Sequence, residues 1–485
     1  MESKAVASSH FLSTKAGEDI LRSGGNAYDA TVATSAALTV VQPHLNGLGG
    51  DFFGIVDDGG VRAVNGNGYA AELATVEFFR SKGMTEIPKR GPLASFTVPG
   101  LVASWAVLAE NCTMPLEKLL APAISYAKEG FRVTPSIAHS ISLSKGMDSD
   151  WEGIYGGISS GGTLYQKQLG RSLEAVAADC GHSFYHGEIA RRIEEDMVRK
   201  GGLIRFSDMD AYEAVVTSPL RVKYRGYDVY TNPPSSQGAT ALMWLNMLER
   251  TDLASMSKAD YYRSILETMK VAYAYRARYI TDPARVHFDE KMLEPGYEYG
   301  TIQPVSGSAP SLSDTTAFSV YDGEVGISAI QSNYMGFGSG HNIAGTGINM
   351  NNRGVYFTLD ADHHNALAPR KKTFHTLMAT LAKGPRTIYT GSMGGDVQPQ
   401  VNVQILCNML DRGMGMQDAI SAPRFAYPSS IYAGSEIYFE RELGLGTGKD
   451  VDNNNSMMGH AQGILVSDVF EKGTDPRGDG LIRYD

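Results

Sequence analysis

The feature that most constrains the fold of this chain is a helix with almost no charge. Residues Ala27–Val41 are mostly Ala, Val and Thr. Asn26 before them and Asp29 three residues later form a capping-box pattern, and Pro43 marks the end of the helix. A helix that is apolar on nearly every side is stable only when other elements cover it. We therefore expect it to be buried against a sheet or between layers.

Other patterns divide the chain into a helical first part and a second part rich in strands. An apolar strand is expected at 52–56, after a glycine-rich turn, and a hairpin at 220–224 and 227–230. Short strands and glycine turns dominate from 315 to 395. Helices are predicted at about 13–23, 115–129, 170–180, 187–200, 239–249, 259–279, 374–382 and 398–411. This distribution predicts a layered α+β or mixed α/β protein.

Composition excludes several classes of protein. The chain has 485 residues, 42% of them hydrophobic and 20% charged, and a formal net charge of -10. These values are typical of a soluble globular protein and argue against a nucleic-acid partner, which would require basic patches. Its 3 cysteines are far apart, so neither a disulfide framework nor a zinc site is expected. With no apolar run of about 18 residues and no signal-like segment at 1–14, we expect a cytoplasmic protein with no membrane partner.

A candidate reaction centre lies where a linker runs into a strand. Residues 303–313 are mostly Pro, Ser, Gly and Ala, which is typical of an exposed linker. Two β-rich runs, 315–321 and 325–331, then flank Asp322-Gly323, a signal for a tight hairpin. If the backbone were cut before Thr315, that residue would carry both a nucleophilic hydroxyl and a free α-amine as base. The alternative is that Thr315 and Thr316 simply open an ordinary strand.

Short motifs spread over nearly the whole chain support the catalytic interpretation. They are Gly24-Gly25-Asn26-Ala27, Gln42-Pro43-His44, Gly49-Gly50-Asp51, Asn232-Pro233-Pro234, Asp314-Thr315-Thr316, Gly336-Phe337-Gly338-Ser339-Gly340, Gly391-Ser392-Met393-Gly394-Gly395 and Thr474-Asp475-Pro476-Arg477. In this order they resemble the gamma-glutamyltranspeptidase family of N-terminal nucleophile hydrolases. The resemblance implies an α+β fold, a four-layer αββα sandwich, and a precursor that cleaves itself between Asp314 and Thr315. A large region, 1–314, and a small one, 315–485, would form one intertwined unit without a cofactor or metal.

The resemblance also implies roles for individual residues. Thr315 Oγ1 would attack the amide carbonyl of a small-molecule substrate while its α-amine accepts the proton. The backbone amides of Gly394 and Gly395 match the oxyanion positions of the family. Ser332 and Asn333 fall near the family's Thr and Asn that steady the nucleophile.

Two further residues, His375 and Thr376, fall where the family has a Ser pair that contacts substrate. On the sequence alone, His375 is either a binding group or a packed, hydrogen-bonded histidine of the core.

The expected substrate pocket departs from the family at two places. The family holds the α-carboxylate of a γ-glutamyl group with an Arg, whose position here is taken by Tyr69 or, in a shifted register, by Asn67. The family's acidic residue for the α-amine aligns with Tyr356, and its nearby Gln aligns with Arg353. Arg353 would suit an acyl group of reversed polarity, such as a dicarboxylic monoamide; its alternative is a surface or structural salt bridge.

Together these observations predict a self-processing threonine amidohydrolase or acyltransferase acting on a γ-glutamyl or related acyl group. Glutathione is one candidate substrate, and a homo-oligomer is compatible with the sequence. The alternative is an unprocessed, non-catalytic relative that binds a small molecule in the same cleft. The missing Arg and acidic residue favour the alternative, whereas Asp314-Thr315-Thr316 and Gly394-Gly395 favour the enzyme.

Overall fold

Two six-stranded antiparallel sheets form the centre of the protein. The computed structural model describes residues 4–144, 147–300, 302, 314–427, 436–446, 448–468 and 470–481, so the predicted linker 303–313 lies outside the described residues. The first sheet has the order β1 (Ala5–Ser8), β9 (Asp314–Tyr321), β10 (Gly326–Tyr334), β2 (Asp51–Asp57), β3 (Val61–Gly66) and β6 (Val215–Thr217). The second has the order β19 (Glu471–Thr474), β18 (Ala461–Val466), β14 (Thr387–Ser392), β13 (Thr380–Lys383), β8 (Tyr227–Thr231) and β7 (Leu220–Tyr224).

The two sheets pack face to face and bury a small apolar core between them. Ser328 Oγ of β10 donates a hydrogen bond to the carbonyl oxygen of Thr390 in β14, at 2.9 Å. The rings of Tyr321 and Tyr389 lie 6.1 Å apart across the same interface. The buried apolar residues of this core are Ala5, Ala7, Phe53, Ile55, Ala63, Ala317, Ile330, Leu377, Ala379, Leu381, Tyr389 and Ile464.

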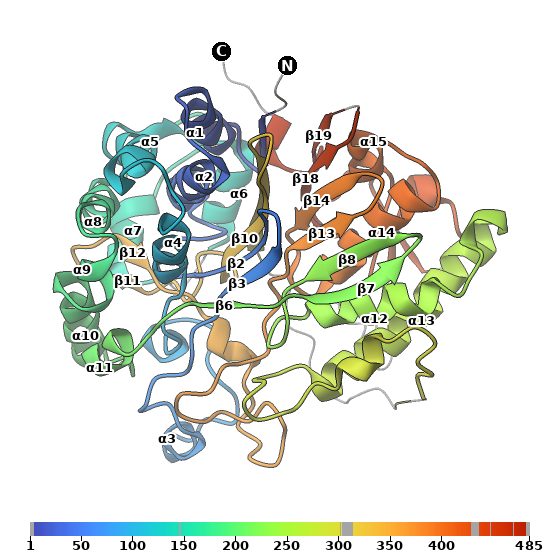
Figure 1. Cartoon of the computed structure of the whole chain (residues 1–485). Coiled ribbons are helices and arrows are strands. Elements are labelled where there is room, and N and C mark those ends of the chain that lie inside the picture. The colour runs from blue at the N-terminus through green and yellow to red at the C-terminus, as the bar shows by residue number, and fades with distance from the viewer. Residues whose placement is uncertain are drawn as a thin grey trace.

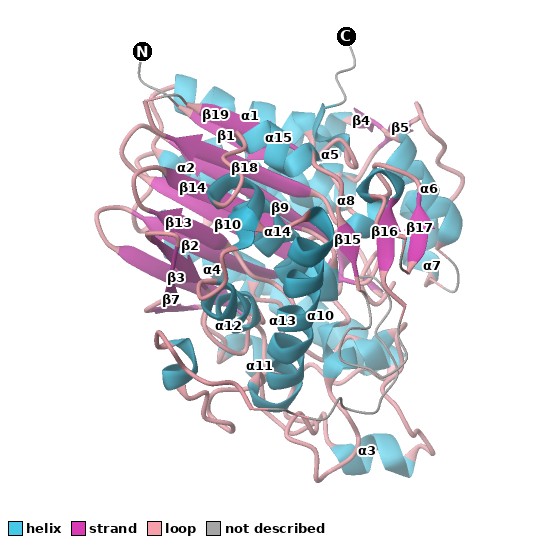
Figure 2. Cartoon of the chain, turned by 90° about the vertical axis from the view of Figure 1, so that its right-hand side faces the viewer, coloured by secondary structure: helices cyan, strands magenta, loops and turns pink. Residues whose placement is uncertain are grey.

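Helices cover both outer faces. The first sheet is covered by α1 (Phe11–Arg22), α2 (Ala27–Val41), α4 (Leu101–Ala109), α5 (Leu116–Glu129) and α8 (Lys167–Ala178), on the left of Figure 1. The second is covered by α12 (Gly238–Leu248), α13 (Lys258–Tyr279), α14 (Gln398–Leu410) and α15 (Met416–Ser421), on the right of Figure 1 and in front in Figure 2. The predicted four-layer αββα sandwich is therefore confirmed.

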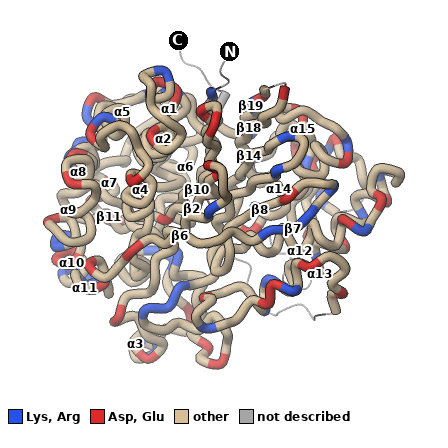
Figure 3. Tube along the Cα trace, in the orientation of Figure 1, with Lys and Arg blue, Asp and Glu red and all other residues tan. Residues whose placement is uncertain are grey.

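Smaller elements complete the chain. The remaining helices are α3 (Val76–Ser81), α6 (Pro135–Leu143), α7 (Ser149–Tyr155), α9 (His182–Tyr185), α10 (Glu188–Lys200) and α11 (Phe206–Asp210). The remaining strands are β4 (Phe131–Arg132), β5 (Thr163–Leu164), β11 (Asn342–Ile343), β12 (Ile348–Asn349), β15 (Phe425–Ala426), β16 (Tyr438–Glu440) and β17 (Lys449–Val451). None of the helices within the described ranges is long and apolar enough to cross a membrane. Acidic and basic segments are interspersed along the outer helices (Figure 3).

The uncharged helix α2 is placed as the sequence predicts. All of its residues are buried, between the first sheet and the helices α1 and α5. Both hydrogen bonds of the capping box form: Asp29 N–H donates to Asn26 Oδ1 at 2.9 Å, and Asn26 N–H donates to Asp29 Oδ2 at 2.8 Å. Local capping and burial together fix where this helix begins and which elements it contacts.

One predicted helix is wrong. Residues 374–382 form an irregular segment that leads into β13, a strand paired with both β8 and β14. Leu377, Ala379 and Leu381 face the other sheet, whereas Met378 and Ala382 face the helices. Side chains buried on both faces give a continuous apolar run, which a short buried helix would also give. Pairing with two neighbouring strands decides in favour of the strand.

The predicted hairpin at Asp322-Gly323 exists with a longer loop. The loop has four residues, because β9 ends at Tyr321 and β10 begins at Gly326. Asp322 N–H donates to the carbonyl oxygen of Val325 at 3.1 Å, and Asp322 Oδ1 accepts the N–H of Val325 at 2.8 Å. The aspartate side chain thus stabilises a turn one residue longer than the predicted strands 315–321 and 325–331 leave between them.

Candidate active site

The predicted nucleophile, Thr315, is the second residue of β9 and is fully buried. Opposite it, the pairing of β9 with β10 is irregular: Gln331 pairs with Thr316, but Tyr334 pairs with Asp314. The extra residue in β10 is a bulge, and Tyr334 adopts a φ of 80°, which is uncommon for a residue with a side chain. Through this bulge Ser332 reaches the Asp314–Thr315 peptide.

The hydroxyl of Ser332 connects the nucleophile to the bond that would be cleaved. It accepts hydrogen bonds from Thr315 Oγ1 at 3.2 Å and from Tyr334 N–H at 2.7 Å. It donates to the carbonyl oxygen of Asp314 at 2.7 Å. A single hydroxyl can therefore receive a proton from the attacking group and stabilise the negative charge that develops on the carbonyl oxygen.

The side chain of Asp314 itself is close to Arg90. Burial raises the pKa of Asp314 to about 7, and the positive charge of Arg90 limits that rise. Arg90 Nη1 donates to the carbonyl oxygen of Gly336 at 2.6 Å, and a Cβ on Gly336 would lie 2.8 Å from Asp314 Oδ2. The segment of the Gly336 motif therefore packs directly against the junction.

Separate hydrogen bonds hold Thr316 and Asn333, which follow the two residues of the Thr315–Ser332 contact. Thr316 Oγ1 donates to Gln42 Oε1 at 3.1 Å and is hydrogen-bonded to Ser9. Asn333 Nδ2 donates to the carbonyl oxygen of Asn349 at 3.1 Å, and Asn333 Oδ1 has no hydrogen-bond partner within the described part of the chain. Thr316 is thus a structural anchor, and Asn333 retains an unused acceptor near the nucleophile.

The predicted oxyanion residues lie at the same end of the sandwich as Thr315. Gly391 of β14 faces Ala317, and Tyr389 faces Tyr321, so β14 and β9 run in opposite directions across the interface. The residues that follow β14 therefore continue toward the start of β9. Gly394 and Gly395 have positive φ values of 125° and 55°, which glycine adopts without strain.

The helix that follows these glycines adds a favourable dipole. A short 3₁₀ turn, Gly395–Val397, leads directly into α14, which has 13 residues. The N-terminus of a helix carries a partial positive charge and unpaired backbone N–H groups. Negative charge developing on an oxygen near Gly394 and Gly395 would be stabilised there.

A buried ion pair holds the glycine turn from behind. Arg424 Nη2 lies 2.8 Å from Asp475 Oδ2, and Arg424 Nη1 donates to the carbonyl oxygen of Gly459 at 3.0 Å. Gly459 packs against Gly394, and the next carbonyl, that of His460, accepts the N–H of Met393 at 2.9 Å. Although burial opposes ionisation, Arg424 and Arg477 hold the pKa of Asp475 below its usual value. This pair explains the motif at Thr474–Arg477.

The cation predicted to contact substrate, Arg353, is fully buried beside the junction. Its Nη1 donates to Thr376 Oγ1 at 2.8 Å, and its guanidinium carbon lies 4.6 Å from the ring centre of Tyr334, which pairs with Asp314. Nε lies 3.8 Å from Asp51 Oδ2. Neither Nε nor Nη2 has a hydrogen-bond partner among the described residues. A buried guanidinium with two unused donors can bind an anion.

His375 pairs with an aspartate that the sequence did not single out as a site residue. His375 Nδ1 accepts the N–H of Leu377 at 3.1 Å, so the ring proton lies on Nε2, 3.0 Å from Asp51 Oδ2. Burial, followed by the charges of Arg353 and Lys372, lowers the pKa of His375 well below its usual value. His375 is therefore buried and hydrogen-bonded on both ring nitrogens, and a role in substrate binding stays a prediction.

The two residues at the position of the family's Arg have different surroundings. The Tyr69 hydroxyl donates to the carbonyl oxygen of Asp208 at 2.7 Å and accepts from Arg370 at 2.9 Å. Asn67 is fully buried, donates to Ser235 and to the carbonyl oxygen of Thr373, and leaves Oδ1 without a partner among the described residues. Asn67, not Tyr69, therefore offers an unused polar atom near His375.

Tyr356 has a carboxylate directly behind it. The Tyr356 hydroxyl donates to Asp396 Oδ2 at 3.3 Å, and Asp396 Oδ1 lies 2.7 Å from Arg276 Nη1. Asp396 and Arg276 are both at least nine-tenths buried. The negative charge that the sequence did not find at this position is thus present but already neutralised.

The sequence profile of gamma-glutamyltranspeptidases matches residues 13–484. The chain belongs to the gamma-glutamyltranspeptidase family. A glutathione hydrolase-like proenzyme of Bacillus subtilis is 37% identical to it, over 98% of this chain and 97% of that protein. An oxamate amidohydrolase proenzyme of Klebsiella pneumoniae is 34% identical, over 97% and 96%. The crystal structure of a cephalosporin acylase from Bacillus halodurans has a TM-score of 0.89 at 33% identity, over 98% and 95% of the two chains.

Membership of this family confirms the prediction of an enzyme that hydrolyses or transfers amide-linked acyl groups, against the non-catalytic alternative. Motifs that include Gln42 and Gly336 lie at the Asp314–Thr315 junction, whereas Gly24-Gly25-Asn26-Ala27 lies at the other end of β9, beside Asp322. Three contributors were missed as site residues: Asp51, Gln42 and Arg424. The only sequence signal for Asp51 and Gln42 is their place in the motifs Gly49-Gly50-Asp51 and Gln42-Pro43-His44. Arg424 lies outside the motifs, so the sequence carries no signal for it.

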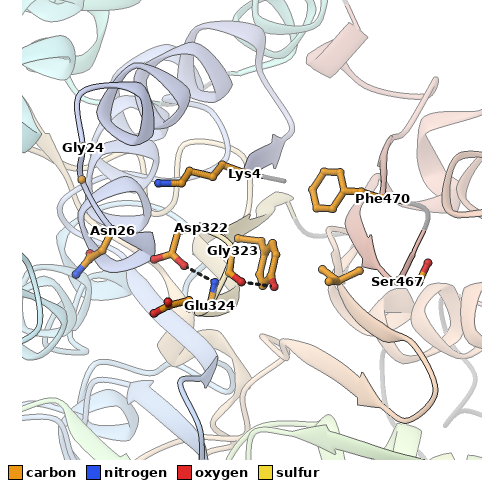
Figure 4. A pocket seen from close by; sticks show the side chains of 11 residues that line it. Lys4, Gly24, Asn26, Asp322, Gly323, Glu324, Ser467 and Phe470 are labelled. Carbon is orange, nitrogen blue, oxygen red and sulfur yellow. Dashed lines mark hydrogen bonds between the residues drawn. The ribbon is translucent and has the colours of Figure 1, made fainter. Parts of the chain in front are cut away.

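A separate cavity lies at the opposite end of β9. It has a volume of about 500 Å³. It is lined by the hairpin loop between β9 and β10 and by segments near both ends of the chain, including Lys4, Asn26, Asp322, Glu324 and Phe470 (Figure 4). Strand β9 has 8 residues, so at about 3.3 Å per residue its two ends are roughly 20 Å apart. This cavity is therefore distinct from the junction at Thr315.

Proposed function

We propose that this protein is a precursor that cleaves itself before Thr315 and then hydrolyses a short amide whose acyl group carries a carboxylate. The buried guanidinium of Arg353, with two unused donors, carries the substrate part of this proposal. The hydrogen bonds of Ser332 support the self-cleavage part.

Self-cleavage needs a base other than the α-amine, because in the precursor that nitrogen belongs to the scissile amide. Ser332 accepts the hydrogen bond of Thr315 Oγ1 and donates to the carbonyl oxygen of Asp314. Thr315 Oγ1 attacks the Asp314 carbonyl carbon, the C–N bond breaks, and the nitrogen takes up the proton, which leaves an ester. Water then hydrolyses the ester. Asp314 gains a carboxylate and Thr315 a free α-amine.

Turnover repeats this chemistry on the substrate. Thr315 Oγ1 attacks the amide carbonyl carbon and its α-amine accepts the proton. The N–H groups of Gly394 and Gly395 stabilise the oxyanion, and the leaving amine departs with a proton. Water releases the acid from the acyl-enzyme, and an amine in place of water would give acyl transfer.

The two fragments would stay together after cleavage. In the first sheet, β9 and β10 of the region 315–485 lie between β1 and β2 of the region 1–314. In the second sheet, β13 of the small region pairs with β8 of the large one. Each region therefore completes both sheets, and the proposed cleavage leaves one intertwined unit. The relatives named as proenzymes support a processed precursor.

Charge around Arg353 favours an acyl group with a carboxylate and no ammonium. A carboxylate could accept a charge-assisted hydrogen bond from Nη2 and share Nε with Asp51, which lies 3.8 Å from it. An ammonium group would need a free carboxylate, but Asp396 is already paired with Arg276. A monoamide of a short dicarboxylic acid fits this balance, and the relative named for oxamate, the monoamide of oxalic acid, supports it. The γ-glutamyl group, which carries both charges, is the second candidate because of the relative named a glutathione hydrolase-like proenzyme.

Steady-state kinetics on a panel of amides test the proposal. The panel contains the monoamides of oxalic, malonic, succinic and glutaric acids, their methyl esters at the carboxylate, and a γ-glutamyl amide. We expect the free acids to be preferred over their esters. In Arg353→Gln, kcat/KM for the acids should fall about 100-fold, as expected when one partner of a buried charged pair is removed, and that for the esters should change little.

Self-cleavage of Arg353→Gln is the matched control, because within the described residues Arg353 donates no hydrogen bond to Ser332, Thr315 or Asp314 and touches their hydrogen-bond chain only through the ring of Tyr334. The variant should still separate into two fragments. Two results would contradict the proposed substrate class. The first is hydrolysis of the γ-glutamyl amide alone, and the second is an equal fall in kcat/KM for the acids and the esters in Arg353→Gln.

A further inference from the structure

Asp51 lies directly behind the cation that would bind the substrate. Its Oδ2 is 3.8 Å from Arg353 Nε and 3.0 Å from His375 Nε2, and all three side chains are at most 1% exposed. Its Oδ1 accepts the N–H of Gly68 at 3.4 Å. The guanidinium thus faces Asp51 with Nε, while Nη2 has no partner within the described residues.

The charges of this buried cluster already balance without a substrate. Arg353 is opposed by Asp51, and the neighbouring Arg276 is opposed by Asp396. Lys372 is opposed first by Asp282, and His375 is held neutral by burial. A substrate carboxylate on Arg353 would add one negative charge. An unbalanced charge in a buried site is costly, and the usual response is a change of protonation.

Asp51 is the group placed to respond. Burial raises its pKa to about 7, against the opposing attraction of Arg353 and, more weakly, Lys372. The other titratable groups that face it are the hydroxyls of Tyr185 and Tyr212, whose pKa values burial raises, so they stay protonated. Sharing Arg353 with a second carboxylate would weaken the attraction that keeps Asp51 ionised.

We propose that Asp51 takes up a proton when the carboxylate of the substrate binds Arg353. This inference rests on the proposed function. Asp51 then acts as a specificity-determining residue, since only an anionic acyl group causes it to be protonated. His375 holds the carboxyl group of Asp51 in place through their hydrogen bond.

Protonation of Asp51 makes the affinity for the substrate carboxylate depend on pH. Well below its pKa of about 7, Asp51 is already neutral in the free enzyme, so binding needs no proton and affinity does not depend on pH. Above pH 7 the free carboxylate is ionised and must be protonated on binding, so the dissociation constant rises by about tenfold for each pH unit until the group also ionises in the complex.

Calorimetric titration of the processed enzyme tests this. The probe is pyruvate, in which a methyl group replaces the amide nitrogen of oxamate, with 4-oxopentanoate as its longer homologue. Titrations at pH 8 in phosphate and in Tris, which differ in ionisation enthalpy, give the number of protons bound. We expect close to one proton at pH 8 and close to none at pH 6.

Three variants locate the proton. Asp51→Asn should bind the probe with no proton uptake and no dependence on pH, because the amide oxygen still accepts from His375. His375→Gln should keep the uptake. Asp411→Asn removes a buried carboxylate that is paired with Arg225 far from the site, and it should also keep the uptake.

The outcomes separate the two proposals. Binding of either ketone acid without buffer dependence in the wild type, or unchanged uptake in Asp51→Asn, would overturn this inference alone. The wild-type result needs no variant to fold. If neither ketone acid binds, the proposed substrate class is wrong and the inference falls with it.

Discussion

Removal of the Ser332 hydroxyl should slow self-cleavage strongly. In Ser332→Ala the carbonyl oxygen of Asp314 loses the donor that lies 2.7 Å away, and Thr315 Oγ1 loses its acceptor. One donor to a developing oxyanion contributes about 100- to 1,000-fold in rate, so the half-time of cleavage should lengthen by that factor. The N–H of Tyr334 also loses its acceptor, which should lower the free energy of unfolding by about 1–3 kcal/mol.

The assay is a time course of freshly purified precursor, followed by denaturing gel and intact mass. Ser332→Thr keeps a hydroxyl and should cleave. Ser328→Ala is the matched control, because Ser328 lies on the same strand, is fully buried, and donates one hydrogen bond, to Thr390. A Ser332→Ala precursor that cleaves as fast as the wild type, or a Ser328→Ala precursor that is equally slow, would refute this role for Ser332.

Two further predictions concern the glycine turn. Gly394→Ala should lower kcat by about 100-fold with little change in KM, because a Cβ would lie 2.4 Å from a methyl group of Val397 and displace the oxyanion donor. Gly413→Ala is the control. Gly413 also has a positive φ, but no atom lies near the added Cβ, so this variant should affect stability only. Arg424→Lys should also lower kcat and leave KM unchanged, because lysine lacks the planar guanidinium that joins Asp475 to the Gly459 carbonyl. The control, Arg225→Lys, should leave kcat unchanged. Steady-state kinetics of processed enzyme measure both, and a rise in KM with constant kcat would contradict them.

The parts of the fold that the sequence predicts are those decided by neighbouring residues. The capping box of Asn26 and Asp29 lies next to the helix that it begins, and the uncharged composition of α2 already demands burial. The strand β13 is the opposite case. The run from Leu377 to Ala382 is compatible with a helix until β8 and β14 pair with it, and those partners are remote in the sequence or follow it.

The candidate site divides in the same way. The resemblance to the family predicts that Thr315, Ser332 and the two glycines share one site. The contact of Asp51 with His375 joins residues 324 positions apart, so no spacing rule reveals it. The same holds for Arg353, whose burial and unused donors depend on side chains from three separate segments. The sequence thus predicts which residues lie at the junction, and it does not reveal the charge balance around Arg353.

The central claim is that Thr315 is released as an N-terminal nucleophile by the protein itself. Intact mass spectrometry of purified wild type and of Thr315→Ala after incubation tests it most directly. The wild type should give two fragments, 1–314 and 315–485, and Thr315→Ala a single chain. A wild type that stays intact after prolonged incubation, or a Thr315→Ala variant cut at the same bond, would contradict the claim.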